Sequence, residues 1–270
     1  MLKRIIENYG KSLCGIKCFA GIVLVFFLFQ LDTNMPIFFS ESRWDILKAT
    51  SDLKSILTNC IHFGMYMPMS MMIATVGFGT QFCNEWRAGV VPQLVKNIGL
   101  KQYAVLYIGM AELSGAIIGG VGFLMYAVFM RLHILFVNPS AANIQTHTIL
   151  YEFTLQDTTG IQFIFVMGLL MTFLGALSSV LALCVSTVSE NRYFVMIAPY
   201  LVYRIYVELS KILHIGNKYR LDYYLLGRQN IGESIMTFCI IMLVLFLLVL
   251  VIGQFVFKQG VRRKLIYGKY

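Results

Sequence analysis

Glu112 is a carboxylate inside a long apolar run, where an ionisable side chain needs a specific environment. The run covers about 102–130, and Glu112 is its only charged residue. At 1.5 Å per residue Glu112 lies about 15 Å in from Gln102, so it must face protein or water rather than lipid. Two roles stay open for it: an interhelical hydrogen bond, or a place in a substrate path or in proton handling.

Arg204 and Glu208 form a second candidate pair, because their i,i+4 spacing puts both side chains on one face of a helix. They lie late in an apolar run that begins near Tyr193. Arg204 stands about 16 Å along the helix axis, past the middle of a hydrocarbon core roughly 30 Å thick. Either the run ends early and both groups sit in the headgroup region, or they line the outer part of a path and gate or orient what passes.

Methionines form a third group of candidate residues, around Pro68. They are Met65, Met67, Met69, Met71 and Met72. Stacked thioethers one helical turn apart can bind Cu(I), whereas methionine is more often deformable filler or an adaptable binding surface. Met65 and Met69 are therefore candidates for a substrate path, and no metal site is predicted.

The sequence offers no catalytic residue set. Gly10-Lys11-Ser12 is similar to the end of a phosphate-binding loop, but Ile5 occupies the position at which that loop requires a glycine. The sequence also contains no Gly-x-Ser-x-Gly motif, no His-x-x-x-His motif and no pair of glutamates within one apolar run. We therefore predict no enzyme activity and no ATP hydrolysis in this chain.

The composition is that of a polytopic membrane protein. Of the 270 residues, 58% are hydrophobic and 13% are charged, and the mean hydropathy is +0.74. Soluble domains are about 25% charged. The net charge of +9 does not indicate nucleic-acid binding, because the basic residues stand at the ends of apolar runs, as the positive-inside rule describes.

We predict an all-α membrane protein with a single transmembrane domain over 1–270. The segment 1–14 has an apolar and a charged face, so we expect a helix in the membrane interface there. Six transmembrane helices are predicted, at about 15–31, 58–82, 102–130, 161–188, 193–212 and 234–257. The N-terminus, the loop after the second span and the C-terminal tail are rich in Lys and Arg, which places both termini in the cytoplasm of a multi-pass protein of the plasma membrane.

The stretch 85–99 interrupts the apolar runs and predicts a short helix at the membrane surface. Its apolar positions fall four apart and form one stripe, consisting of Trp86, Val90, Leu94 and Ile98. We expect an elbow at Glu85–Gly89, followed by a helix at about Pro92–Ile98, because proline suits the first turn of a helix. Gly99 predicts where that helix ends.

This stretch resembles the first cytoplasmic loop of the permease subunits of type-two ABC exporters, where an acidic residue, a glycine, a short amphipathic helix and a Gly-x-x-x-Tyr entry into the next span form the coupling helix. The matching residues are Glu85, Gly89, Leu94, Gly99 and Tyr103. The order of six spans extends the resemblance, and residues 214–233 resemble the re-entrant extracellular segment before the last span of that family. The resemblance implies that coupling to a separate ATPase subunit involves Glu85, Arg87, Gly89, Leu94, Lys96 and Gly99, with Glu190 in the next cytoplasmic turn.

The resemblance further implies partners. Two permease subunits, identical or paralogous, would pair in the lipid bilayer above two cytoplasmic ABC ATPase subunits. This chain would hold no cofactor, because ATP and Mg belong to the ATPase, and the cargo would be a peptide, a drug or another amphiphile. Two other functions stay open on the residues: an ion- or proton-coupled carrier that uses Glu112 and Arg204, and a membrane scaffold or immunity protein that transports nothing.

Overall fold

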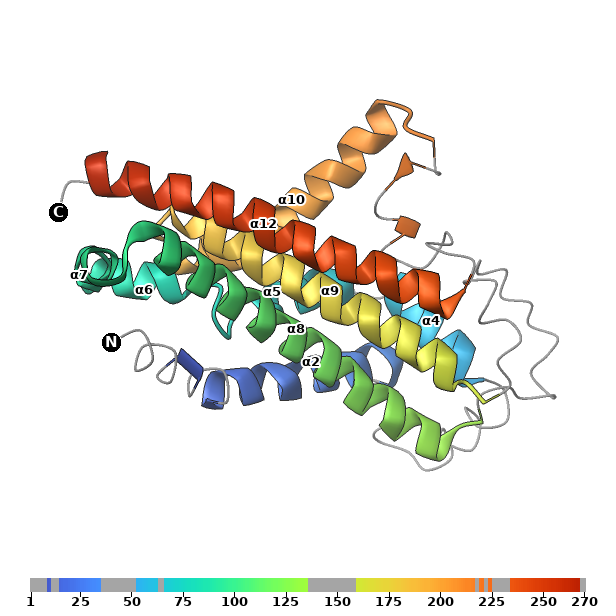
Figure 1. The fold of residues 1–270 in the computed structure, drawn as a ribbon. Helices are drawn as coiled ribbons and strands as arrows, with labels where there is room; N and C mark the ends of the chain where they lie inside the picture. Colours follow the sequence, from blue (N-terminus) through green and yellow to red (C-terminus); the bar gives the residue numbers. More distant parts are fainter. Residues whose placement is uncertain are drawn as a thin grey trace.

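The computed structural model describes residues 9–10, 15–34, 52–62, 66–135, 159–216, 219–220, 223–224 and 234–267, and within these residues it contains helices and no strand (Figure 1). The helices are α2 (Ile16–Asn34), α4 (Leu53–His62), α5 (Tyr66–Ala74), α6 (Gln81–Arg87), α7 (Val90–Ile98), α8 (Leu100–His133), α9 (Ile161–Ser186), α10 (Arg192–Ile212) and α12 (Ile235–Tyr267). The prediction of an all-helical fold is therefore confirmed for this part of the chain.

Among the described residues, three helices, α8, α9 and α12, are long and apolar enough to cross a membrane. Shorter than these, α2 has its apolar part at Ile16–Leu31. The predicted runs at 102–130, 161–188 and 234–257 thus correspond to helices, and α12 continues to Tyr267, past the predicted end at 257. These features are those of a membrane protein.

The predicted second span at 58–82 is wrong as a single helix. In the structure α5 ends at Ala74, residues 75–80 form turns, and α6 begins at Gln81. Within the turns the Thr75 hydroxyl donates to the Met72 carbonyl oxygen at 2.7 Å, and such back-bonding competes with helix propagation. Gly77 packs so tightly against Ser114 that a side chain at position 77 would clash, so close packing also holds the turn in place.

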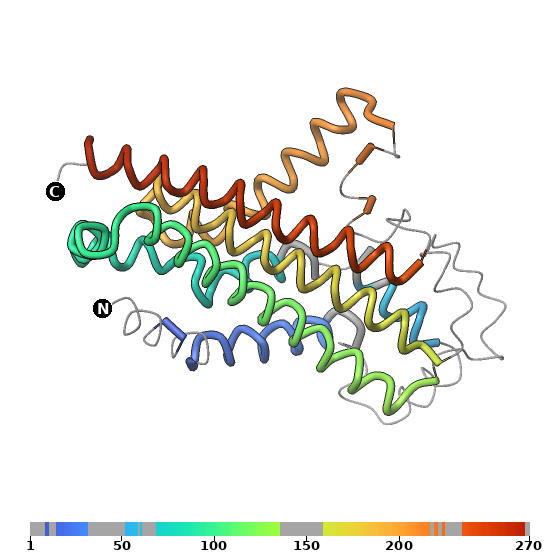
Figure 2. Tube along the Cα trace, in the orientation of Figure 1, coloured from blue at the N-terminus to red at the C-terminus, as the bar shows by residue number. Residues whose placement is uncertain are grey.

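Long helices run side by side through the molecule, and α8 packs most extensively on α9 (Figures 1 and 2). At their crossing Gly115 faces Gly175, and a Cβ atom on either glycine would lie less than 3.0 Å from the other's carbonyl oxygen. A Cβ on Gly119 would lie 2.6 Å from the Met171 carbonyl oxygen. Ala111, Gly115 and Gly119 stand four residues apart on α8, and this spacing of small residues lets another helix approach closely.

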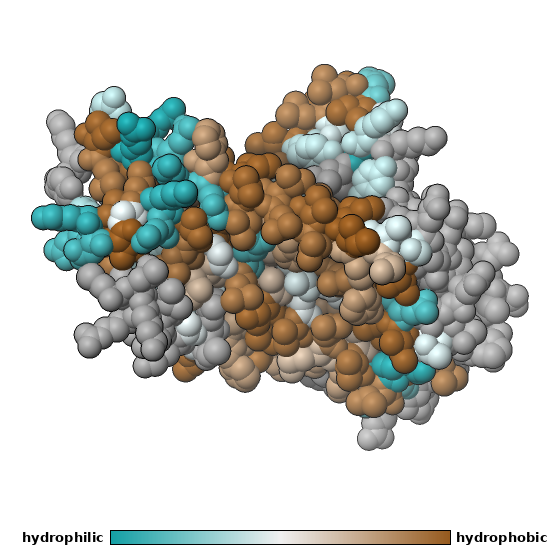
Figure 3. Space-filling view, viewed as in Figure 1, coloured by the Kyte–Doolittle hydropathy of each residue, from teal (hydrophilic) through white to brown (hydrophobic). Residues whose placement is uncertain are grey.

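Hydropathy divides the surface into a polar end and an apolar middle. Figure 3 shows an apolar band across the middle of the bundle and a hydrophilic cluster at the end where α6 and α7 lie in Figure 1. The described part of the N-terminal segment and the end of α12 lie at this same end (Figure 1). At the other side of the bundle, α10 runs at an angle to the long helices, and its last turns project from them (Figure 2).

Replacing Gly115 by alanine tests the α8–α9 crossing. The new methyl group meets the backbone of Gly175, so we expect a loss of roughly 1–3 kcal/mol in the free energy of unfolding. Gly109→Ala is the matched control on the same helix, because nothing lies within 4 Å of a Cβ at that position. Thermal unfolding in detergent measures both variants, and equal midpoints for the two would contradict the crossing.

Candidate functional site

A glycine elbow connects α6 to α7 at the polar end of the bundle. Gly89 has φ +67°, a left-handed conformation that glycine adopts without strain, and Gly99 ends α7 at φ +81°. The predicted short helix and its end at Ile98 are confirmed, although the helix begins at Val90. The elbow lies at 88–89 rather than beginning at Glu85, because Glu85 belongs to α6.

Crosswise to the bundle, α7 lies with its apolar face turned inward. Figure 1 shows α7 almost end-on while α8 runs across the view. Val91 is fully buried, and Leu94, Val95 and Ile98 are partly buried against an apolar cluster that includes Tyr103 of α8. Apart from Val90, the stripe therefore packs on the chain's own bundle. The exposed side chains of α7 are those of Val90, Gln93, Lys96 and Asn97.

Glu85 accepts two hydrogen bonds inside this end of the bundle. Tyr9 Oη donates to its Oε1 at 2.9 Å, and Gln81 Nε2 donates to the same oxygen at 2.8 Å. Tyr9 Oη also lies 2.5 Å from Tyr107 Oη, so the N-terminal segment joins α6 to α8. We expected Glu85 at the elbow, but its Oε1 accepts from Tyr9 and Gln81, and the Gly89 N–H donates to the Trp86 carbonyl oxygen at 3.0 Å.

Two buried oxygen atoms of the cluster around Glu85 lack a hydrogen-bond partner among the described residues. They are Glu85 Oε2 and Tyr103 Oη. Burial raises the pKa of Glu85 above its ordinary value, against the opposing effect of the hydrogen bonds from Gln81 and Tyr9. Aromatic rings close the cluster on one side, with the Tyr9 ring centroid 5.6 Å from that of Phe78 and 5.3 Å from that of Tyr107.

A second set of contacts joins α6 to the α9–α10 connection. Arg87 Nη2 donates to the Glu190 carbonyl oxygen at 2.6 Å, and the Cys83 thiol donates to the Ser189 carbonyl oxygen at 3.5 Å. The structure thus brings together Arg87 and Glu190, both of which the resemblance implied to be coupling residues. Burial raises the pKa of Cys83, with neighbouring cations opposing the effect.

Lys264 connects α12 to the same surface, a role that the sequence did not reveal. Its Nζ lies 3.1 Å from Glu190 Oε1 and 4.8 Å from the centroid of the Trp86 ring, and its side chain is 11% exposed. A cation shielded from water over an indole face is held more firmly than an exposed surface ion pair. Spacing alone could not distinguish Lys264 from the other basic residues of the tail.

Glu112 lies in the middle of α8 and is 8% exposed. Its Oε2, like the hydroxyl oxygens of Ser114 and Ser179, is buried without a hydrogen-bond partner among the residues that the structure describes. The interhelical hydrogen bond considered for Glu112 is therefore not formed within this part of the chain.

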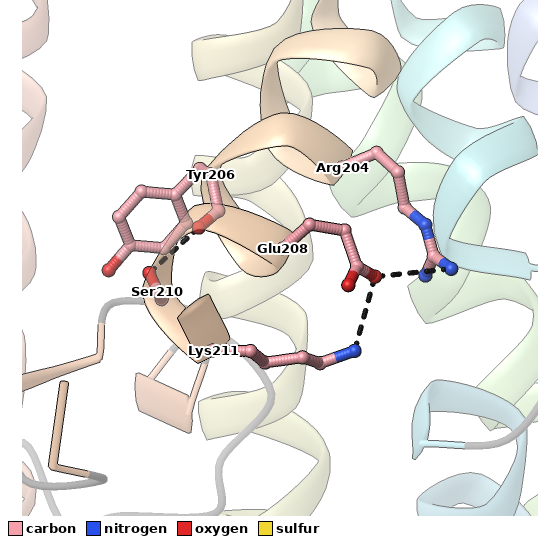
Figure 4. A network of polar contacts seen from close by, with 5 residues as sticks. All are labelled: Arg204, Tyr206, Glu208, Ser210 and Lys211. Atoms are coloured by element: carbon pink, nitrogen blue, oxygen red, sulfur yellow. Dashed lines mark hydrogen bonds and ion pairs between the residues drawn. The ribbon is translucent and has the colours of Figure 1, made fainter. Parts of the chain in front are cut away.

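Arg204 and Glu208 form an exposed network on α10 (Figure 4). Glu208 Oε1 lies 3.3 Å from Arg204 Nη2 and 3.1 Å from Lys211 Nζ, and the Arg204 and Glu208 side chains are 59% and 45% exposed. Exposed pairs of this kind contribute about 0.2–1 kcal/mol to stability. The i,i+4 pairing is confirmed, whereas a role in a path stays a prediction.

Several predictions concern residues outside the described part of the chain. Met65, most of the helix at 1–14 and most of the segment 214–233 belong to them. Met69 is exposed on α5, and Met71 is buried. Among the described residues, no group of three His, Cys, Asp or Glu side chains lies close enough to hold a metal ion.

The predicted coupling residues gather at one end of the molecule. Glu85, Arg87 and Gly89 lie on α6 and the elbow, Leu94, Lys96 and Gly99 on α7 and its end, and Glu190 in the adjoining connection. Glu112 and Arg204 lie elsewhere, on α8 and α10. Comparison of the chain with protein-family models, with curated proteins and with solved structures finds no match.

Glu85→Gln tests the buried carboxylate through pH. A raised native-state pKa means that the native state binds the proton more tightly, so stability is greatest at low pH and falls as pH rises through that pKa. The variant keeps an oxygen acceptor for Tyr9 and Gln81 but carries no charge. We expect it to become increasingly more stable than the wild type from about pH 4 to about pH 8, on either side of the ordinary carboxyl pKa.

Unfolding midpoints in detergent across that pH range provide the measurement. Glu208→Gln controls for the loss of one negative charge, because it lies on the exposed face of α10 and makes no contact with Tyr9 or Gln81. A stability difference between Glu85→Gln and the wild type that does not change with pH would contradict the proposed cost of burying the carboxylate.

Proposed function

We propose that this chain is the permease subunit of a type-two ABC exporter, which forms a translocation path and couples to a separate ATPase subunit. The observation that carries the proposal is the unit of α6, elbow and α7. A short amphipathic helix lies crosswise at the polar end of the bundle, with glycines in left-handed or extended positive-φ conformations on either side, and a membrane-length helix follows directly.

The contacts of α7 supply a route for mechanical coupling. Val91 and Leu94 pack on the apolar cluster that contains Tyr103 of α8 and Phe257 of α12. A protein bound to the exposed side of α7 would therefore move α8 and α12 together with α7. The contact of Arg87 with Glu190 extends the same rigid unit to the α9–α10 connection.

The proposed topology has six spans with both ends of the chain in the cytoplasm. Exposed basic side chains gather at the α7 end, on Lys96, Lys101, Arg192, Lys258 and Arg262. The described acidic groups there, Glu85 and Glu190, are hydrogen-bonded or ion-paired. This excess of cations supports a cytoplasmic position for the α7 end in the plasma membrane.

In the proposed assembly two permease chains pair and two ATPase subunits bind below them. Six spans per chain are too few to enclose a large path alone, which favours a path between two copies or paralogues. The cargo class that fits an apolar, methionine-containing interior is a peptide, a drug or another amphiphile.

Glu112 favours a second candidate, a carrier coupled to an ion or proton gradient. A carboxylate in the middle of a membrane-length helix without a described partner is a common feature of proton and ion pathways. The two functions differ in their energy source. Transport in vesicles that contain an ion gradient but no ATP would support the carrier, whereas transport that requires ATP and the ATPase would support the exporter.

Single cysteines test the topology. Leu135 and Val188 are exposed beyond opposite ends of the bundle, after α8 and after α9. In a background without native cysteines, we expect an impermeant maleimide to label Leu135→Cys in intact cells, and Val188→Cys only after permeabilisation. Cys83 is unsuitable because its thiol is buried. Labelling of Val188→Cys in intact cells would invert the topology.

Charge reversal on α7 tests the coupling. Lys96→Glu changes an exposed side chain of α7, so we expect the chain to insert normally while co-purification with the ATPase falls roughly tenfold, together with transport. Lys101→Glu is the matched control, because Lys101 is also exposed but lies in the first turn of α8. Leu94→Asp is less informative, because Leu94 packs on the bundle itself. Wild-type transport and co-purification with Lys96→Glu would refute the coupling assignment.

A further inference from the structure

An apolar groove runs between α2 and the second half of α8, which lie side by side (Figure 1). Its volume is about 520 Å³, and Phe26, Leu124, Met125, Val128, Phe129 and Leu132 are among the residues that line it. The rings of Phe26 and Phe129 meet edge to face at 5.8 Å between centroids, which fixes the junction of the two helices. Leu124, Met125 and Val128 are exposed, so the groove is open to the surroundings of the bundle.

The groove lies in the half of the membrane that is remote from α7. Leu124 and Arg131 follow Tyr103 by about 32 Å and about 42 Å along the axis of α8, at 1.5 Å per residue. With α8 tilted by about 40°, Leu124 lies about 24 Å and Arg131 about 32 Å along the membrane normal, so Leu124 is inside a hydrocarbon core about 30 Å thick and Arg131 is at its far side. The groove therefore faces acyl chains, and Arg131 lies level with the headgroups.

A positively charged side chain, that of Arg131, lies beside this apolar groove near the end of α8. Arg131 shares a face of α8 with Leu124 and Val128, at spacings of seven and three residues. His133 stacks on Phe129 at 4.7 Å between ring centroids, and its Nδ1 lies 2.8 Å from the Phe129 carbonyl oxygen. Arg131 makes no ion pair with any described residue.

The start of α4 brings one acidic residue, Asp52, to the end of α8. Leu53 N donates to the Leu135 carbonyl oxygen at 3.0 Å, which places the beginning of α4 beside the end of α8. The Asp52 carboxylate there accepts a hydrogen bond from Ser55 N at 2.9 Å and so caps α4. This carboxylate caps the helix terminus, and in the described part of the chain it forms no ion pair with Arg131.

We propose that the groove binds an anionic phospholipid, with an acyl chain against Phe26, Leu124 and Val128 and the phosphate beside Arg131. An arginine guanidinium and a phosphate form charge-assisted hydrogen bonds, which are strongest at the edge of an apolar region. His133 adds a second polar group at the same level. The site follows from the membrane position of α8 and is independent of what the protein transports.

A second copy of the chain fits the groove less well. A two-fold contact brings the same surface of both copies together, so two Arg131 side chains would approach each other next to hydrocarbon. A lipid phosphate supplies the opposite charge, whereas the second copy supplies a like charge. The charge above the groove therefore selects a lipid.

Native mass spectrometry with added lipid tests the site. The full chain in mild detergent is offered phosphatidylglycerol or phosphatidylcholine with the same acyl chains. We expect the wild type to retain phosphatidylglycerol roughly tenfold better, Arg131→Gln to lose this preference and Arg131→Lys to keep most of it. Lys211→Gln, which removes an exposed cation from α10, should behave as the wild type.

Filling the groove provides a separate test. Leu124→Trp should reduce the retention of both lipids, whereas Leu247→Trp, which changes another exposed leucine, on α12, should not. Thermal unfolding midpoints close to that of the wild type establish that the variants are folded. If Arg131→Gln proves unfolded, the Arg131→Lys and Leu124→Trp results decide.

Three results would overturn the proposal. The first is equal retention of the two lipids by the wild type, and the second is undiminished lipid retention by Leu124→Trp. The third is a disulfide between two copies of Met125→Cys in native membranes, since it would show that a second copy covers the groove.

Discussion

The contact between the backbones of Gly115 and Gly175 fixes the distance between α8 and α9, and the other helices are arranged around this pair. In lipid, apolar side chains gain little by leaving their surroundings, so packing and close backbone approach must hold helices together. The two glycines provide that approach in the middle of both helices. With this spacing set, α2 packs on α8, and α12 packs on both α8 and α9. The bundle thus depends on two positions at which no side chain fits.

At the α7 end, the elements are joined by polar contacts rather than by close backbone packing. Tyr9 Oη contacts both Glu85 and Tyr107, while Lys264 contacts both Glu190 and Trp86. Each of these residues joins elements that are distant in the sequence. A short helix of nine residues would be marginal alone in water. Here α7 is held by the elbow, by the buried Val91 and by the elements that surround them, and can therefore act as one piece with the bundle.

The sequence predicted the helices well wherever an uncharged run was uninterrupted. In lipid, runs of this kind fold mainly as helices, because a helix satisfies its own backbone hydrogen bonds. The break at 75–80 was missed, since hydropathy does not record that Thr75 bonds to the Met72 carbonyl oxygen or that Gly77 packs on Ser114. The apolar stripe of α7 was predicted from the sequence, but the surface on which it packs was not. An amphipathic pattern does not identify the apolar surface that it will contact. The partners of Glu85 were equally hidden: Tyr9 is 76 residues away in the chain.

The position of Lys264 over Trp86 gives the molecule an optical property. The chain has two tryptophans, and Trp86 is the one in the described residues, stacked on Phe82 with the ammonium group of Lys264 4.8 Å from its ring centre. The energy of an indole's excited state depends on nearby charge, and the field of a charge falls steeply with distance in a medium of low dielectric constant. Any sliding of α12 against α6 would therefore change the colour and the intensity of Trp86 emission. The junction between the last helix and the elbow carries its own intrinsic fluorophore.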